Sequence, residues 1–337
     1  MGGNGTTFWS RALRRHWPWL RDRQLPPPSA MADASEMPGV TVGGYPLVRT
    51  FAHGALGELH LATDPDSGAP VAIKTVRLHH GELTRERFLR ESQAAGRLRH
   101  PGIVRTRGAG VEGHGDSAIG WIAMEWVPGS DLARYAAASR LLPEPLVIEL
   151  MAQAAEALAH AHTQGVVHRD IKPANLLFSP GRAILKIADF GCAHLSDAER
   201  SRSGVLAGTP VYMAPEQLAG APVDGRCDLY ALGVVLFELL TGRLPLEAAS
   251  MGDLLLAITT QPAPSLTTLR SDLPVELSNL VARLLAKRPD DRPSDGAALA
   301  RELRHVGTAL RPAVVSPGAS GPTSTGTMAV PPTATPS

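Results

Sequence analysis

Residues 166–177 read VVHRDIKPANLL, with polar side chains set between two apolar runs. The carboxylate of Asp170 can accept a proton from a hydroxyl group. The ammonium of Lys172 can steady a transferring phosphoryl group, and Asn175 offers an amide oxygen to a metal ion. The segment therefore indicates a site for chemistry rather than a simple loop.

A second segment, ILKIADFG at residues 184–191, follows closely. Asp189 comes after a strand-like run and before a glycine turn, a position that suits a carboxylate bound to Mg²⁺. Upstream, the apolar strand VAIK ends on Lys74, whose charge can be aimed at phosphate oxygens. Glu91 lies on the apolar side of a helical pattern and needs a cationic partner, for which Lys74 is the candidate.

Glycines punctuate the segment FAHGALGEL at residues 51–59, between two predicted strands. Gly54 and Gly57 would let the backbone approach a bulky anion and direct N–H groups toward it. Taken alone, two glycines in a hairpin more often mark only a turn, and a lysine at a strand end is more often solvated. Each feature alone is a weak indication of function, and only their common order along the chain makes them specific.

The hydrophobic patterns predict strands first and helices afterwards, an α+β layout. Expected strands are 45–51, 58–62, 71–76 and 121–126, and expected helices are 83–98, 145–162, 228–241, 273–286 and 294–310. Gly242 is predicted to end the helix 228–241.

Composition divides the chain into three parts. Residues 1–43 form a basic, tryptophan-containing extension and linker, residues 44–310 form the folded domain, and residues 311–337 form a Pro/Ser/Thr/Ala-rich tail. Both ends are expected to be disordered, because they offer too little apolar area to offset the entropy of ordering. Residues 8–20 could instead form a short amphipathic helix against a membrane or a partner.

Charge and cysteine content exclude several protein classes. With 33 basic and 32 acidic residues the net charge is +1, which argues against a nucleic-acid binder. Two cysteines, Cys192 and Cys227, cannot form a disulfide framework and favour a reducing compartment, the cytoplasm. No transmembrane segment is expected. Of four lysines, Lys186 and Lys287 have no assigned chemistry and are expected to be solvated.

The ordered set of motifs resembles the signature of protein kinases, and most closely the eukaryotic-type (Hanks-type) serine/threonine kinases of bacteria. Later segments fit as well: GTPVYMAPEQ at 208–217, DLYALG at 228–233, and Arg292. The resemblance covers residues 44–310. It implies a bilobal fold with a small β-rich lobe (44–127) and a large α-helical lobe (128–310).

The resemblance also implies a role for each matching residue. Asp170 and Lys172 would be catalytic, and Asn175 and Asp189 would hold Mg²⁺, which Mn²⁺ could replace. Lys74 would contact the ATP phosphates and pair with Glu91, while Met124 would lie behind the adenine. Residues implied to bind ATP are Ala52, Gly54, Gly57, Leu59, Ala72, Lys74, Glu91, Met124, Glu125 and Val127. Structural roles fall to a buried Glu216–Arg292 ion pair and to Asp228, which would hold the catalytic loop.

One position departs from the family pattern, since Ala52 stands where the first loop glycine is usual and would stiffen the loop. Arg169, directly before Asp170, implies control by phosphorylation of the loop 189–216. Ser201 and Ser203 are the candidate sites, with a solvated loop serine as the alternative, and Thr209 would shape the substrate pocket. Phosphorylation between two copies would use a homodimer.

The expected activity is transfer of the γ-phosphoryl group of ATP to serine or threonine of proteins, including this chain itself. A scaffold with the same fold is the first alternative; loss of Lys74, Asp170 or Asp189 would be its usual sign, and all three are present. A small-molecule kinase is the second, and the segment 208–217 argues against it.

Overall fold

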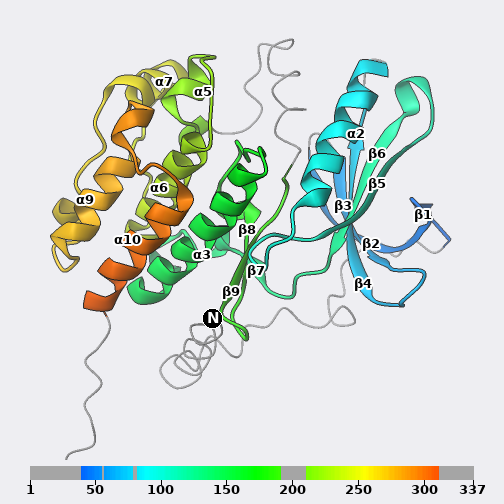
Figure 1. Ribbon diagram of the computed structural model, residues 1–337, viewed down its shortest axis with the longest axis horizontal. Coiled ribbons are helices and arrows are strands. Elements are labelled where there is room, and N and C mark those ends of the chain that lie inside the picture. The colour runs from blue at the N-terminus through cyan, green and yellow to red at the C-terminus, as the bar shows by residue number, and fades with distance from the viewer. Residues whose placement is uncertain (1–38, 55–56, 79–81, 191–209, 311–337) are drawn as a thin grey trace, which may run out of the picture.

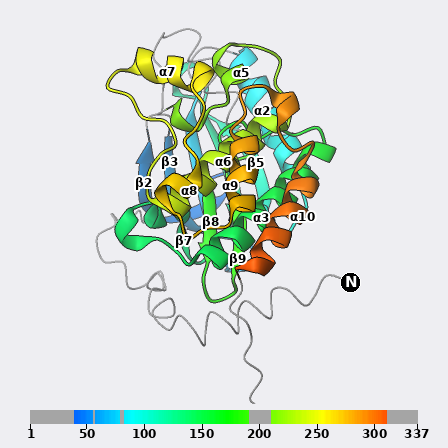
Figure 2. The same ribbon diagram turned by 90° about the vertical axis from the view of Figure 1, so that its left-hand side faces the viewer.

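Two lobes make up the computed structural model, which describes residues 39–54, 57–78, 82–190 and 210–310. A β-sheet with one long helix forms the smaller lobe, and a bundle of helices forms the larger one (Figure 1). A small sheet lies between them. When the molecule is turned, the helices of the larger lobe stand in front of the sheet (Figure 2). The predicted α+β, bilobal architecture is confirmed.

Six strands form the sheet of the smaller lobe, in the order β1-β2-β3-β4-β6-β5, and every neighbouring pair is antiparallel. Hairpins place β1 to β4 side by side in chain order, whereas α2 separates β4 from β5, so that β6 pairs with β4 and β5 lies at the edge. The elements of this lobe are β1 (Thr41–Val42), β2 (Tyr45–Gly54), β3 (Gly57–Thr63), β4 (Pro70–Arg77), α2 (Glu82–Arg97), β5 (Thr106–Glu112) and β6 (Ile119–Glu125).

Apolar side chains alternate along β4 and β6, so each face of the sheet has its own small core. One face carries a cluster that includes Ile73 and Ala123, both fully buried. The other face packs against α2 through Phe88, whose ring lies over Gly120. A side chain at Gly120 would strike that ring, so the glycine permits the helix to approach the sheet.

The larger lobe is built around two buried helices, α3 and α6, which pack against each other. Nearly every residue of α6 is buried, as expected for an apolar helix in the middle of a bundle. Gly242 ends α6 with a φ of 72°, the left-handed cap that the sequence predicts. The elements of this lobe are β7 (Ser130–Asp131), α3 (Glu144–Thr163), β8 (Leu176–Ser179), β9 (Ile184–Ile187), α5 (Pro215–Leu218), α6 (Arg226–Thr241), α7 (Met251–Thr260), α8 (Leu266–Leu269), α9 (Val275–Leu284) and α10 (Gly296–Ala309).

The ion pair expected in this lobe is present. Arg292 donates to both carboxylate oxygens of Glu216, at 2.6 and 2.8 Å, and its guanidinium lies 5.0 Å from the ring centre of Tyr230. Arg292 also donates to the carbonyls of Ala286 and Arg226. Because these bonds use most of the guanidinium hydrogens, the charge can stay buried, and it joins the end of α9 to α5 and α6.

The predicted strands and helices all occur, with ends shifted by a few residues. The elements that were not expected are β1, β5, β7, β8, α5, α7 and α8. The proposed helix at 8–20, Ser201, Ser203, Thr209 and Cys192 lie outside the described residues. No helix within the described part of the chain is both long and apolar enough to cross a bilayer.

Lys287 contradicts the expectation of a solvated lysine. Its Nζ atom is shielded from solvent and has no hydrogen-bond partner among the residues that the structure describes. Burial, and then repulsion by Arg292, lower the pKa of Lys287 from its ordinary 10.5 to about 8. At neutral pH the folded state therefore holds an ammonium that burial disfavours.

The free-energy cost of burying the charged Lys287 should depend on pH. Below pH 8 Lys287 is charged in both states and the cost is fully present, whereas between about pH 8 and 10.5 the unfolded chain binds more protons. The contribution of Lys287 to stability therefore improves as pH rises through this window. We expect Lys287→Met to raise the melting temperature at pH 7 and to raise it less at pH 10. An equal effect at both pH values would contradict this account.

Candidate active site

The segment around Asp170 is held in place by one buried carboxylate. Asp228, on α6, accepts the backbone N–H groups of His168 (2.8 Å) and Arg169 (2.7 Å), and it is bonded to Nε2 of His162 (2.8 Å). Arg169 has a φ of 64°, a strained value for a non-glycine residue. These hydrogen bonds hold the strained backbone and fix where Asp170 lies, which matches the role predicted for Asp228.

Two other predicted residues, Lys172 and Asn175, contact Asp170. Lys172 Nζ lies 2.7 Å from its Oδ2, and the amide nitrogen of Asn175 donates to the same oxygen (3.1 Å) and to the Asp170 carbonyl (2.7 Å). Because both of these bonds use the amide nitrogen, the amide oxygen of Asn175 faces the other way, where a cation could bind it. Asp170 keeps about 39% of its side chain exposed, so a substrate can reach it.

Asp189 and Lys74 bring the two lobes together. Lys74, on β4, places Nζ 2.9 Å from Oδ2 of Asp189, which follows β9 with a φ of 65°. Burial acts to raise the pKa of Asp189, but attraction to Lys74, helped by His168 and Lys172, outweighs burial and holds that pKa below its ordinary value. Asp189 is therefore an anion suited to a divalent cation.

Glu91 makes a contact that the sequence does not reveal. Its Oε1 accepts from Nε of Arg87, one helical turn earlier on α2, at 3.0 Å. The predicted pair of Lys74 with Glu91 stays a prediction.

Residues predicted to enclose a nucleotide base share one hydrophobic cluster. Met124 is buried within it, and Leu59, Ala72 and Val127 pack against it. Two residues that sequence reasoning missed, Leu177 on β8 and Ala188 after β9, join from the larger lobe. The backbone N–H of Glu125 donates to the Arg105 carbonyl at 2.9 Å, so this N–H is not available to a base.

Comparison with known proteins agrees with this geometry. The sequence model described as "Protein kinase domain" matches residues 45–305. The chain belongs to the protein kinase family. It is 36% identical over 287 residues to "Serine/threonine-protein kinase pkn3" of Myxococcus xanthus, covering 81% of this chain and 52% of that protein. It is 35% identical over 275 residues to PknB of Mycolicibacterium smegmatis, covering 78% and 43%.

The fold of this kinase also matches solved structures. The kinase domain of Mycobacterium tuberculosis PknI is 33% identical, with a TM-score of 0.64, and the match covers 81% of this chain and all of that domain. The chain spans about half the length of the curated relatives that it matches. Members of the family use ATP with a divalent metal ion. The oxygen ligands of Asn175 and Asp189 fit such an ion, because Mg²⁺ usually takes few protein ligands and completes its shell with phosphate and water.

Gly57, one of the predicted loop glycines, is needed for a close approach between strands. A Cβ at this position would overlap the carbonyl oxygen of Thr75 on β4. Ala52, the departure from the family pattern, lies opposite Leu59 and is exposed, so its methyl group is accommodated. His53 is also largely exposed, with 73% of its side chain accessible, although its Nδ1 lies 3.3 Å from Glu58.

A glycine pair in this kinase gives a matched test. Gly57→Ala should lower the melting temperature and raise KM for ATP, because the new methyl group must push β3 away from β4. Gly96→Ala, on α2, should be neutral or stabilising, since nothing lies within 4 Å of a Cβ there and alanine favours helix. Thermal unfolding and initial rates at varied ATP check both. Equal effects of the two substitutions would contradict the steric argument.

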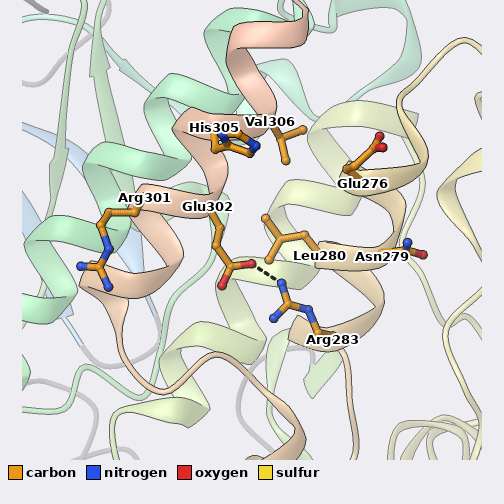
Figure 3. A pocket seen from close by; sticks show the side chains of 8 residues that line it. All are labelled: Glu276, Asn279, Leu280, Arg283, Arg301, Glu302, His305 and Val306. Carbon is orange, nitrogen blue, oxygen red and sulfur yellow. Dashed lines mark hydrogen bonds and ion pairs between the residues drawn. The ribbon is translucent and has the colours of Figure 1, made fainter.

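A cavity of about 480 Å³ lies elsewhere in the larger lobe, between α9 and α10 (Figure 3). An ion pair between Arg283 and Glu302 joins the two helices across it. None of the predicted site residues lines this cavity, so it is separate from the nucleotide site.

Proposed function

We propose that this chain is a serine/threonine protein kinase that transfers the γ-phosphoryl group of Mg-ATP to hydroxyl groups of proteins. The observation that carries the proposal is a pair of neighbouring polar groups. Lys172 and Asn175 both bond Asp170, and Lys74 of the smaller lobe pairs with Asp189 of the larger one. The charge of Lys172 also acts on Asp189. The printed names of the relatives support the same activity.

In the proposed reaction each of these residues has a separate role. Asp170 would orient the substrate hydroxyl and accept its proton as the phosphoryl group moves. Lys74 and Lys172 would offset the negative charge of the phosphates, and Asn175 and Asp189 would hold the metal ion, Mg²⁺ or Mn²⁺, which neutralises phosphate charge when bound. Such a reaction depends on positioning and charge, which explains why strained residues are held so firmly here.

The segment after Thr209 supports a peptide as the acceptor. The side chain of Gln217, on α5, donates to the carbonyl of Arg169 at 3.0 Å, so a hydrogen bond joins the segment 210–217 to the residue before Asp170. Tyr212 donates to Glu238 at 2.7 Å and fixes the same segment to α6. We include in the proposal that Thr209 shapes the peptide pocket and that Ser201 and Ser203 are phosphorylated by a second copy of the chain, through a transient homodimer.

The cytoplasm is the proposed location. The support is chemical: the thiol of Cys227 is buried, and burial followed by the charge of Asp228 raises its pKa, so it is an unreactive packing group and not part of a disulfide among the described residues.

Incubation with labelled ATP and Mg²⁺, followed by acid hydrolysis, tests the proposal. We expect labelled phosphoserine or phosphothreonine in the chain itself and in an added basic protein, and none when EDTA removes the metal ion. Nucleotide binding without any labelled amino acid would favour the scaffold. Label in a small molecule only would favour a small-molecule kinase.

A further inference from the structure

Lys186 contradicts the expectation of a solvated lysine in a different way from Lys287. Its Nζ lies 2.6 Å from Oε1 of Glu125, and about a fifth of its side chain is exposed. The same oxygen accepts the backbone N–H of Arg105 at 2.8 Å. Glu125 in turn donates its own N–H to the Arg105 carbonyl at 2.9 Å. One carboxylate therefore joins three segments that are far apart in the sequence.

These segments belong to different lobes. Glu125 is the last residue of β6, in the sheet of the smaller lobe, whereas Lys186 lies on β9, in the small sheet of the larger lobe. Next to Lys186, Ile187 exchanges backbone hydrogen bonds with Gly102 (2.8 Å) and Val104 (2.9 Å). The segment 102–104, which leads into Arg105, is thus already attached to β9 of the larger lobe.

The connection between the lobes is held at its other end as well. A Cβ at Gly129 would overlap the Phe178 carbonyl on β8, and the Ser179 hydroxyl donates to the Pro128 carbonyl. Only residues 126 and 127 lie between this contact and Glu125. Opening of the lobes must turn the backbone near these residues, because the backbone on both sides is attached to β8 and β9.

We propose that the Lys186–Glu125 ion pair is an interlobe latch that restrains opening of the nucleotide cleft, with Lys186 as a positioning residue. The latch lies beside Met124 and Val127, whose side chains belong to the predicted base pocket, and three residues before Asp189. Breaking it frees the smaller lobe to open, so bound nucleotide escapes faster. This inference rests on the proposed function, because it assumes that the cleft holds ATP and ADP.

Dissociation of a fluorescent ADP analogue in Mg²⁺, followed by stopped flow, tests the latch. Lys186→Gln should raise the dissociation rate by about threefold or more, the size of effect expected for a partly buried ion pair. Lys186→Arg keeps the cation and should restore most of the parent rate. Arg182→Gln, on the exposed turn between β8 and β9, removes a charge from the same hairpin outside the latch and is the matched control.

A double-mutant cycle provides the second readout. Glu125→Gln should also speed release, and combination with Lys186→Gln should add little, because either change already breaks the pair. If one variant does not fold, the other serves alone. A rate for Lys186→Gln equal to that of Arg182→Gln, or fully additive effects in the cycle, would overturn the latch. A parent protein that binds no nucleotide would instead contradict the proposed function.

Discussion

Replacement of Asp170 by asparagine is expected to lower the rate of phosphoryl transfer by about 10²- to 10⁴-fold, the usual contribution of a positioned general base. The amide keeps the shape of the side chain and can still bond Asn175, but it cannot accept the hydroxyl proton. Because Asp170 does not lie in the base cluster around Met124, nucleotide affinity should change little. Initial rates and a nucleotide binding titration separate the two effects.

Asp66→Asn is the control for this prediction. Asp66 lies on the exposed turn between β3 and β4. Its replacement by asparagine is the same chemical change as Asp170→Asn, made away from Asp170. We expect it to leave the transfer rate unchanged. An Asp170→Asn variant as fast as Asp66→Asn would show that Asp170 does not act as the base.

Replacement of Asp228 by alanine is expected to destabilise the larger lobe by about 3–5 kcal/mol, the range for breaking a buried charged network. The substitution leaves the N–H groups of His168 and Arg169 without their acceptor in a fully buried place. It also releases the strained backbone of Arg169, so activity should fall together with stability. Denaturant unfolding measures the first effect, and hydrogen exchange at residues 166–172 measures the second.

Asp228→Asn distinguishes the two contributions. Its amide oxygen can still accept one of the backbone N–H groups, so the loss of stability should be smaller than for alanine. A change below about 1 kcal/mol for Asp228→Ala would mean that another group fixes the catalytic loop.

Local sequence was sufficient to predict an element when its hydrophobic pattern and its end signal both lie within that element. Helix α6, with its apolar run and Gly242 cap, was predicted to within two residues at its start and to the same residue at its end. Strand β5 was missed because Gly108 and Gly110 weaken its strand pattern. The Trp121 ring explains Gly110, since it lies 2.7 Å from where a Cβ of Gly110 would be. A contact with the next strand, not local preference, makes this segment a strand.

Contacts between residues distant in sequence could not be predicted from the hydrophobic pattern of either segment. The pairing of Lys186 with Glu125, and the burial of Lys287 against Arg292, depend on how the lobes and the α9–α10 segment pack. The place of Leu177 was equally hard to predict, because an apolar residue on a strand gives no sign of which hydrophobic cluster it packs against. The motifs point to polar residues in the candidate site. The partners of Lys186 and the packing of Leu177 became known only from the three-dimensional structure.

Intact-mass spectrometry tests the central claim most directly. The parent chain, first treated with a phosphatase and then freed of it, is incubated with Mg-ATP beside Asp170→Asn. We predict that the parent gains mass in whole phosphoryl steps, located on serine or threonine, and that Asp170→Asn gains them at least about 10²-fold more slowly. A parent that binds Mg-ATP but transfers no phosphoryl group, either to itself or to an added protein, would contradict the claim that this chain is a protein kinase enzyme.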